Sequence, residues 1–460
     1  MGSALGPRRS IESMSIVDVA WAALGEDPSA LALVRDRGDA VALDSALPVG
    51  RLVHDTIAAA SLSAALLAAR RTGSAVPMVE LDPVRVATAV TSERHFRLDG
   101  DPMSAWAELS GFWPTADGWV RTHANYPHHR DRLLDALGLP VGTTADELLA
   151  HLHTRTAQEV DDAVAARGGV ASVVRTERQW RQHPHARVVA GQPLLGMTRV
   201  GEATGCELHD TDMDAPARGM RVLDLTRVIA GPVATRTLAL WGADVLRVDS
   251  PWLPEIPWQH LDTGAGKRST TIDFEKDRAM LDELVETADV VGTGYRAGAL
   301  DRFGLSPEAL AERRPGIVVA RLSAWGTEGP LADRRGFDSI VQAATGIAWL
   351  ESTDDVKPGA MPAQALDHSA GYLLAAGITT AMRHRLDDGG SWLVETSLAR
   401  VAHELLDAPR VGRMSHPAWQ PTVITRGDVT SAAAAPHYDA GPDDWADPAV
   451  PWGSSEAAWL

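Results

Sequence analysis

A single aspartate stands near the start of the apolar run ALDHSAGYLLAAGI, which begins at Ala365. The carboxylate of Asp367 is expected to be ionised near neutral pH, so it could act as a nucleophile without a general base. Aspartate is also favoured as the N-cap of a helix, where its side chain accepts hydrogen bonds from free backbone N–H groups. Taken alone, the pattern favours the N-cap, and the two roles are compatible. Backbone N–H groups from His368 to Gly371 would then be available to stabilise an oxyanion.

Strand and helix patterns alternate from Met220 onward and predict an α/β fold. The strand candidates are RVLDLT, DVLRVD, TTIDF, DVVGTG, IVVARLS and SWLVETSL, and helices can be placed between most of them. Such alternation is typical of a mostly parallel sheet covered by helices. Ligands of doubly wound sheets bind beyond the carboxyl ends of the strands, where Arg227, Gly294, Ser323 and Asp367 are expected to fall or approach.

The remainder of the chain has different patterns. Before residue 200, segments such as SIVDVAWAAL and LVHDTIAAASLSAALLAARR are typical of helices. The segment CELHDTDMDAPARG is acidic and then contains proline and glycine, which indicates a linker. After about Ala408 the sequence is rich in Ala, Pro, Asp and Trp without periodicity, and it predicts an irregular or partly disordered tail.

Composition narrows the class of protein. A chain of 460 residues suggests two or three domains, since domains commonly hold roughly 100–200 residues. A net charge of −18 argues against nucleic acid as a partner. No uninterrupted apolar stretch approaches the roughly 20 residues of a membrane helix, and the first residues lack the apolar run of a signal peptide. The single cysteine, Cys206, fits a reducing compartment, so we expect a cytoplasmic protein without a membrane partner.

Two further patterns resemble familiar motifs without fitting them. In GTGYRAG, the glycines Gly292, Gly294 and Gly298 follow a strand candidate, but the last spacing is one residue too long for a dinucleotide fingerprint. NAD is therefore not expected. The segment VETSL around Ser397 has no partner histidine in a recognisable nucleophile context.

Segments from Met220 onward follow the order and spacing of one enzyme family. They are MRVLDLTRVIAGP, LWGADVLRVD, GKRSTTIDF, ADVVGTGYRAGALDRFGL, ARLSAWGTEGP, RGFDSIVQAATG and ALDHSAGYLLAAGI. Together they resemble the family III coenzyme A transferases, the CaiB/BaiF family that includes formyl-CoA transferase. The resemblance implies a Rossmann-like, doubly wound, mostly parallel large domain and a smaller α+β domain.

A second resemblance lies N-terminal to the first. The segments LSGFWPTADGWVRTHANYPHHRDRLLDALGL and GGVASVVRTERQWRQHPHARV resemble the small C-terminal domain of the same family. Here the small domain precedes the large one, so we predict a circularly permuted arrangement, which is tolerated where chain termini lie close together on the surface. The predicted division is a helical region at 1–80, a small domain at 81–205, a linker at 206–219, a large CoA-transferase domain at 220–410 and an irregular tail at 411–460.

The family resemblance implies a reaction and a set of contacts. Coenzyme A would move between an acyl-CoA thioester and a carboxylic acid through an aspartyl-CoA intermediate, with Asp367 as the nucleophile. Coenzyme A would enter as the acyl-CoA substrate, no metal or NAD would be needed, and a homodimer is expected. Residues that match the family's CoA contacts are Arg227, Val228, Ala230, Tyr295, Arg302, Ser323 and Trp325. Without the resemblance, Tyr295, Arg302 and Trp325 would be interpreted as a core aromatic, a surface charge and a packing residue.

Several histidines could suggest a metal site. They are His123, His128 and His129 in HANYPHH, and His183 and His185 in HPH. They fall in the part that resembles the small domain, where the family uses no metal. We therefore expect surface or hydrogen-bonded histidines.

Three alternative functions stay open. A 2-methylacyl-CoA racemase would need a histidine opposite the aspartate, but the matching position is Phe337, which cannot carry a proton. A CoA-dependent lyase or a noncatalytic acyl-CoA-binding relative also fits the motifs. The segment SPWLPEIPWQHL after Asp249 departs from the family pattern, as do Gly264 and Ala265 before GKRS, and both departures lie near the expected CoA site.

Overall fold

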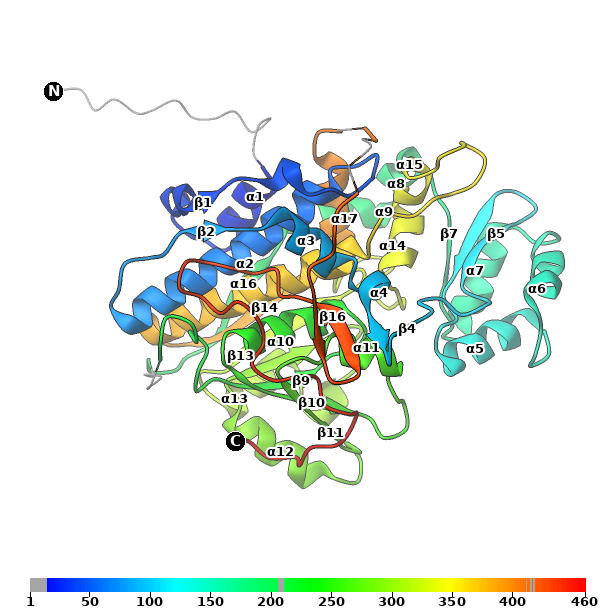
Figure 1. Cartoon of the computed structure of the whole chain (residues 1–460). Coiled ribbons are helices and arrows are strands. Elements are labelled where there is room, and N and C mark those ends of the chain that lie inside the picture. Colours follow the sequence, from blue (N-terminus) through cyan, green and yellow to red (C-terminus); the bar gives the residue numbers. More distant parts are fainter. Residues whose placement is uncertain (1–14, 206–210, 411, 414–415, 417) are drawn as a thin grey trace.

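The structure is a computed structural model that describes residues 15–205, 211–410, 412–413, 416 and 418–460 (Figure 1). Three predicted segments lie partly outside these ranges: the helical region at 1–80, the linker at 206–219 and the tail at 411–460. Cys206 also lies outside the described residues. The five-part division of the chain stays a prediction.

A seven-stranded sheet lies at the centre of the main body. Its strand order is β11-β10-β9-β12-β13-β14-β8, in which the first six strands are parallel and β8 is antiparallel to β14. The strands are β8 (Gly196–Gly201), β9 (Arg221–Leu225), β10 (Asp244–Asp249), β11 (Lys267–Thr271), β12 (Val290–Thr293), β13 (Val318–Ser323) and β14 (Ser391–Ser397). All six strand candidates contribute to this sheet, although TTIDF enters it only with Thr270 and Thr271. The predicted α/β class is confirmed.

Helices cover both faces of the sheet. Successive strand side chains point to opposite faces, so Val222 and Val290 pack into one core while Leu223 and Val291 pack into the other. The first core includes residues of α2, α10 and α16, and the second includes residues of α12 and α13. These helices are α2 (Val49–Thr72), α10 (Ala230–Leu240), α12 (Arg278–Thr287), α13 (Pro307–Arg313) and α16 (Ala365–Asp388). The central strands β9, β10, β12 and β13 are largely buried and rich in Val and Leu, as expected for strands covered on both faces. By contrast, β11 has the polar sequence KRSTT and the edge strand β8 is partly exposed.

Helix α2, from the N-terminal region, lies along α16 in the core (Figure 1). The Ser63 hydroxyl joins the two helices by donating to the Ala376 carbonyl at 2.9 Å and by a hydrogen bond to the Thr379 hydroxyl at 2.6 Å. Among the described residues, α2 is the one helix long and apolar enough to cross a membrane by length and composition. Since 94% of its most apolar stretch is buried inside the protein, core packing accounts for its composition.

A smaller α+β unit lies at one side of the main body (Figure 1). Its antiparallel strands are β5 (Gly111–Pro114), β6 (Trp119–Thr122) and β7 (Ala171–Val173), and its helices are α5 (Pro127–Leu137), α6 (Ala145–Leu152) and α7 (Ala157–Ala166). These elements enclose their own core, which includes Val120, Leu134 and Leu148. The unit falls inside the predicted small domain, but β8, near the end of the same segment, belongs to the large sheet.

The C-terminal segment packs along the body of the molecule. A four-stranded sheet joins it to the N-terminal region through β3 (Arg97–Leu98), β4 (Asp101–Pro102), β15 (Val423–Arg426) and β16 (Val429–Ala432). The prediction of an irregular tail is wrong at β15 and β16, and beyond Ala432 the chain has no further helix or strand among its described residues. It is nevertheless well packed, because Tyr438 and Trp445 are buried and the Ser455 N–H donates to the Ser269 carbonyl at 2.7 Å.

Shorter elements complete the described structure. They are α1 (Ile16–Ala23), α3 (Pro83–Val90), α4 (Ser92–His95), α8 (Glu177–Gln182), α9 (Pro184–Ala190), α11 (Pro257–Asp262), α14 (Asp338–Thr345), α15 (Ile347–Leu350), α17 (Leu398–Asp407), β1 (Val34–Arg35), β2 (Val79–Glu80) and the 3-10 turns Pro28–Leu33, Gly38–Ala40 and Asp301–Phe303. Of these, α4, α11 and α14 carry residues of the site.

Helices α10 and α16 approach closely at Gly371. A Cβ atom at this position would lie 2.5 Å from the Ala230 carbonyl oxygen and 2.9 Å from the Val233 Cβ. The first of these partners is a backbone atom, which cannot rotate out of the way. Because Gly371 has no side chain, the two helices can approach this closely about one turn beyond Asp367.

We expect the Gly371→Ala variant to unfold with a free energy about 1–3 kcal/mol below that of the native chain, because the added methyl overpacks the contact. This loss should appear although alanine is favoured over glycine in helices by about 1 kcal/mol. Urea denaturation would measure it. The control is Gly118→Ala, since a Cβ at Gly118 meets open space. Equal stability of the two variants would contradict the close approach.

Candidate active site

Asp367 lies inside the first turn of α16 and is buried. The N-cap of this helix is Gln364, whose side chain makes no capping hydrogen bond, so the interpretation of Asp367 as the N-cap is wrong. A different carboxylate caps the helix. Asp338 Oδ2, from the start of α14, accepts hydrogen bonds from the backbone N–H of Leu366 at 2.8 Å and of Asp367 at 3.0 Å. Two carboxyl groups therefore meet at the start of α16.

The surroundings of both carboxyl groups favour their protonated forms, so the expectation that Asp367 is ionised like a free carboxyl group is wrong. Burial, followed by the negative charge of Asp338, raises the pKa of Asp367 well above its usual range. Burial also raises the pKa of Asp338 to about 6, against the effect of hydrogen bonds from Gln342 and from the start of α16. The expectation that backbone N–H groups from His368 onward are free is wrong at its first position, because His368 N–H donates to the Gln364 carbonyl at 3.1 Å.

Asp367 faces a small cavity, which we call the inner chamber. Its volume is about 60 Å³. The lining residues come from the N-terminal region, the small unit and the large sheet, and they are Glu93, Ala105, Trp106, His123, Asn125, Val228, Ile229, Trp258, Gln259, Phe337, Ser339, Gln364 and Asp367. Segments that are far apart in the sequence thus converge on the aspartate.

A second cavity, which we call the outer cleft, adjoins the inner chamber at Val228 and Phe337, since both residues line both cavities. Its volume is about 260 Å³. The sequence-predicted residues Arg227, Val228, Tyr295 and Ser323 line it, together with Gly294. The remaining lining residues are Tyr126, His128, His129, Arg132, Leu253, Arg296, Ala299, Ala324, Ala332, Arg334, Arg335, Gly336 and Phe337.

Three sequence-predicted residues lie outside the linings of both cavities. Ala230 is buried as the first residue of α10. Trp325 is buried and its indole N–H donates to the Arg335 carbonyl at 3.4 Å. The side chain of Arg302 is 70% exposed and pairs with Glu275 at 3.3 Å. Of the three, only Trp325 contacts a residue of the outer cleft through a hydrogen bond.

Four arginines of the outer cleft were missed by the motif comparison. Arg334 is paired with Asp161 at 2.6 Å, whereas Arg132, Arg296 and Arg335 have no ion pair within the part of the chain that the structure describes. Burial and the charges of Arg296 and Arg132 lower the pKa of Arg335. Like charges held together in this way form a binding site for an anion such as a phosphate. The signal for Arg335 was available, because it opens the family-like segment RGFDSIVQAATG.

Val228 lies between the two cavities in an unusual backbone conformation. Its φ is +73°, a left-handed value that β-branched residues rarely adopt. Its N–H donates at 3.0 Å to Glu255 Oε2, which also accepts from Arg247 at 3.0 Å. Burial alone would raise the pKa of Glu255, but Arg247 and Arg227 lower it to about 2. The ionised Glu255, which lies in the segment that departs from the family pattern, thus fixes the turn at Val228.

The histidines of HANYPHH line the cavities. The ring of His123 stacks on Phe337 with 4.0 Å between centroids and faces the inner chamber, while His128 and His129 line the outer cleft. His123 and His129 are buried and the Nδ1 of each has no hydrogen-bond partner among the described residues, so the expectation of a surface or hydrogen-bonded ring is wrong for both. By contrast, His185 is a hydrogen-bonded ring, since its Nε2 donates to the Trp325 carbonyl at 2.8 Å. For His123, burial lowers the pKa to about 3, so the ring is neutral near pH 7. Across the described ranges, no group of three or more His, Cys, Asp or Glu side chains could hold a metal ion.

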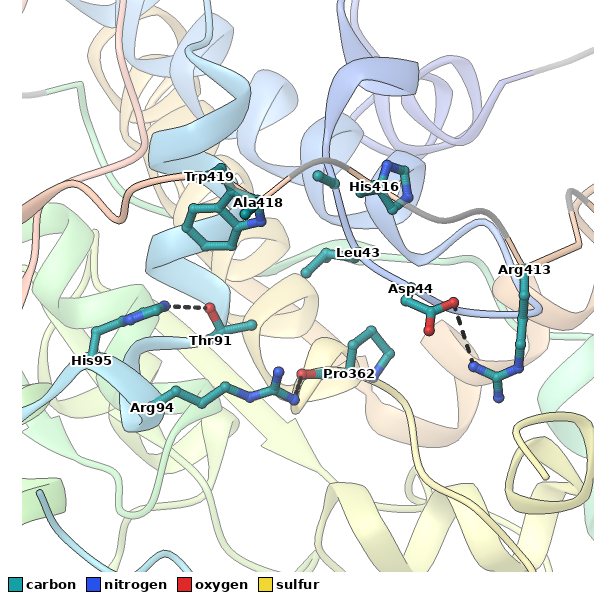
Figure 2. Close-up of a pocket in the computed structure, with 11 residues that line it drawn as sticks. Leu43, Asp44, Thr91, Arg94, His95, Pro362, Arg413, His416, Ala418 and Trp419 are labelled. Carbon is teal, nitrogen blue, oxygen red and sulfur yellow. Dashed lines mark hydrogen bonds and ion pairs between the residues drawn. The ribbon is translucent and has the colours of Figure 1, made fainter. Parts of the chain in front are cut away.

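A larger cavity of about 680 Å³ lies beside α4 (Figure 2). Its lining residues are Ala42, Leu43, Asp44, Thr91, Arg94, His95, Pro362, Arg413, His416, Ala418 and Trp419. None of the sequence-predicted site residues is among them. Because Glu93 lines the inner chamber while its neighbour Arg94 lines this cavity, α4 borders both spaces.

Comparison with known proteins agrees with the motifs. Residues 218–445 match the sequence model of CoA-transferase family III. The resemblance to this family is confirmed. The probable fatty acyl-CoA transferase Rv3272 of Mycobacterium tuberculosis is 34% identical over 202 residues, which cover 41% of this chain and 51% of the relative. The formyl-CoA:oxalate CoA-transferase of Afipia carboxidovorans is 33% identical over 185 residues, which cover 37% of this chain and 43% of the relative.

A solved structure of the hypothetical protein Rv3272 from Mycobacterium tuberculosis is 35% identical. The match has a TM-score of 0.39 and covers 42% of this chain and 57% of that one. The chain therefore spans about half the length of the relatives that it matches.

We expect Arg335→Ala to weaken binding of free CoA by about tenfold or more, because hydrogen bonds to charged groups contribute about 1.5–3 kcal/mol. Isothermal titration calorimetry would measure the dissociation constant. Arg302→Ala serves as the matched control and should leave the constant unchanged, since that side chain lies outside both cavities. The reverse pattern would favour the motif-based assignment of Arg302 over the geometry of the cleft.

Proposed function

We propose that this protein transfers coenzyme A between an acyl-CoA thioester and a carboxylic acid, with Asp367 as the nucleophile. The observation that carries the proposal is the buried aspartate in a small chamber that adjoins an arginine-lined cleft. In this arrangement the phosphates of CoA would lie among the arginines, and the thioester would pass Val228 and Phe337 to reach Asp367. The proposed reaction uses neither a metal ion nor NAD.

The proposed exchange proceeds in balanced steps. The ionised form of Asp367, which the raised pKa makes less abundant near neutral pH than it is for a free carboxyl group, attacks the acyl-CoA carbonyl carbon. This forms a mixed anhydride and releases the CoA thiolate. The thiolate attacks the aspartyl carbonyl carbon, which forms an aspartyl-CoA thioester and releases the first carboxylate. The acceptor carboxylate attacks this thioester, and the released thiolate then attacks the acceptor's acyl carbon. New acyl-CoA leaves and the Asp367 carboxylate is restored.

The shape of the site is suited to these steps. The Asp338 carboxylate accepts hydrogen bonds from the N–H groups of Leu366 and Asp367, so it fixes the turn that carries the nucleophile. Burial of Asp367 removes water that would otherwise hydrolyse an anhydride or a thioester. The positive end of the α16 dipole favours negative charge that develops nearby.

We also propose finer features that follow from the family resemblance. The sheet would be a Rossmann-like, doubly wound sheet, which its strand order and its helices on both faces support. The chain would be a circular permutation of the family's two domains, act as a homodimer and work in the cytoplasm. The position of the small unit in the sequence supports the permutation, and the single cysteine fits the compartment.

The proposed function predicts loss of CoA exchange by about a thousandfold or more in Asp367→Asn, because an amide cannot form the anhydride or the thioester. The assay would follow labelled CoA from an acyl-CoA donor to a carboxylate acceptor. Asp39→Asn is the control, since 95% of that side chain is exposed. Calorimetry should show that Asp367→Asn still binds CoA. Undiminished exchange by the variant would exclude Asp367 as the nucleophile.

A second candidate is racemisation of a 2-methylacyl-CoA. It is favoured by one observation, which is that His123 lines the inner chamber together with Asp367 although Phe337 stands at the expected histidine position. Racemisation exchanges the α-proton and needs no acceptor. Deuterium uptake at that carbon in D₂O without a carboxylate acceptor would therefore favour it. A noncatalytic relative would bind CoA and show neither exchange.

A further inference from the structure

The inner chamber has a polar lining that the transfer reaction itself does not require. Beside Asp367, its polar side chains are Glu93, His123, Asn125, Gln259, Ser339 and Gln364. The hydroxyl of Ser339 is buried, and no hydrogen-bond partner for it lies among the described residues. An unpaired buried hydroxyl is costly, so a bound polar group would stabilise it. The lining therefore suits an acyl group that carries an oxygen beyond its thioester.

The chamber is also small. Its volume of about 60 Å³ is well below the 260 Å³ of the outer cleft, so it is the narrower of the two adjoining cavities. A long alkyl chain would have to enter this narrower space and would place apolar carbon against six polar side chains. Size and polarity both disfavour a fatty acyl group.

The charges near the chamber limit the acyl group further. No lysine or arginine belongs to the lining, whereas the carboxyl groups of Glu93 and Asp367 do, and Asp338 caps the helix beside them. A second carboxylate on the acyl group would meet several carboxyl groups, and the nearby Arg94, which lies outside the lining, already pairs with Glu93 and donates to the Pro362 carbonyl. A dicarboxylic acyl group is therefore disfavoured, and a hydroxyl is the oxygen that fits.

Glu93 is held where it can contact such a hydroxyl. The Ser92 hydroxyl donates to Asp262 Oδ2 at 2.6 Å, and the Arg94 guanidinium donates to the Pro362 carbonyl (Figure 2). These two bonds fix α4 on either side of Glu93. The Glu93 carboxylate itself makes no side-chain hydrogen bond within the described ranges, and it lies 3.8 Å from Arg94 Nε. Burial raises its pKa to about 7, so near neutral pH it can donate or accept a hydrogen bond.

Building on the proposed function, we propose that the acyl group transferred at Asp367 is short, uncharged and hydroxylated, and that Glu93 and Ser339 bind its hydroxyl. The inference deepens the proposed function by naming the substrate class. It assigns a specificity role to Glu93, a residue of the N-terminal region that no family motif singles out.

Two donors that differ by one hydroxyl test the proposal. These are 2-hydroxypropionyl-CoA and propionyl-CoA, compared with succinyl-CoA and decanoyl-CoA, each with its own labelled acid as acceptor. We expect kcat/KM for the hydroxylated donor to exceed that for propionyl-CoA by about tenfold, the effect of one good hydrogen bond, and the other two donors to be poorer. In Glu93→Leu the ratio of kcat/KM for the hydroxylated donor to kcat/KM for propionyl-CoA should fall towards one. In Glu93→Gln, which keeps a hydrogen-bonding side chain, most of the preference for the hydroxylated donor should remain.

The outcomes distinguish failure of the proposed substrate class from failure of the proposed transferase function. Exchange that depends on Asp367 but is fastest with propionyl-CoA, succinyl-CoA or decanoyl-CoA would overturn the substrate class and leave the transferase function standing. An unchanged ratio in Glu93→Leu would overturn the role of Glu93. If Glu93→Leu fails to fold, the ratio of kcat/KM for the hydroxylated donor to that for propionyl-CoA still tests the substrate class in the native chain. The same ratio in Glu93→Gln then tests the role of Glu93. Absence of exchange with every donor would overturn the proposed function and the substrate class together.

Discussion

The site depends on the hydrogen bonds from the start of α16 to the Asp338 carboxylate. A helix begins with backbone N–H groups that have no partner within the helix, and here two of them donate to Asp338 Oδ2 at 2.8 and 3.0 Å. The same contact brings a second carboxyl group beside Asp367 in a buried place. Asp338 thus caps the helix and also adds to the rise in the nucleophile's pKa that burial produces. The close approach at Gly371 then packs the start of α16 against α10.

Around this contact, three parts of the chain supply different functions. The part of the chain built on the large sheet provides Asp367, on α16, and the strained turn at Val228 between β9 and α10, which the buried Glu255 keeps in place. The small unit contributes Arg132 to the outer cleft and His123 to the inner chamber. The N-terminal region contributes Glu93 through the short helix α4. The site is therefore complete only when all three parts are packed together.

The sequence was sufficient for features that are local. Local patterns predicted six of the seven strands, with β11 predicted only in part and β8 not at all, and motif order singled out Asp367 and four residues of the outer cleft. It was insufficient where function depends on convergence of distant segments. Glu93, Arg132 and Glu255 reach the site through packing between units, which no local pattern encodes. Arg302 follows a family motif, but its short turn directs it to solvent. The tail lacks periodicity, yet Trp445 is buried against the body.

The central claim is that Asp367 is a nucleophile whose pKa is raised by burial and further by Asp338, and quenched peptide mass spectrometry tests it most directly. The native chain and Asp338→Asn would be mixed with an acyl-CoA at a series of pH values. We predict a CoA adduct on the peptide that carries Asp367, increasing with pH as this raised-pKa carboxyl ionises. Loss of the neighbouring charge should move the midpoint to lower pH in Asp338→Asn. An adduct on another residue, or an unmoved midpoint, would contradict the account.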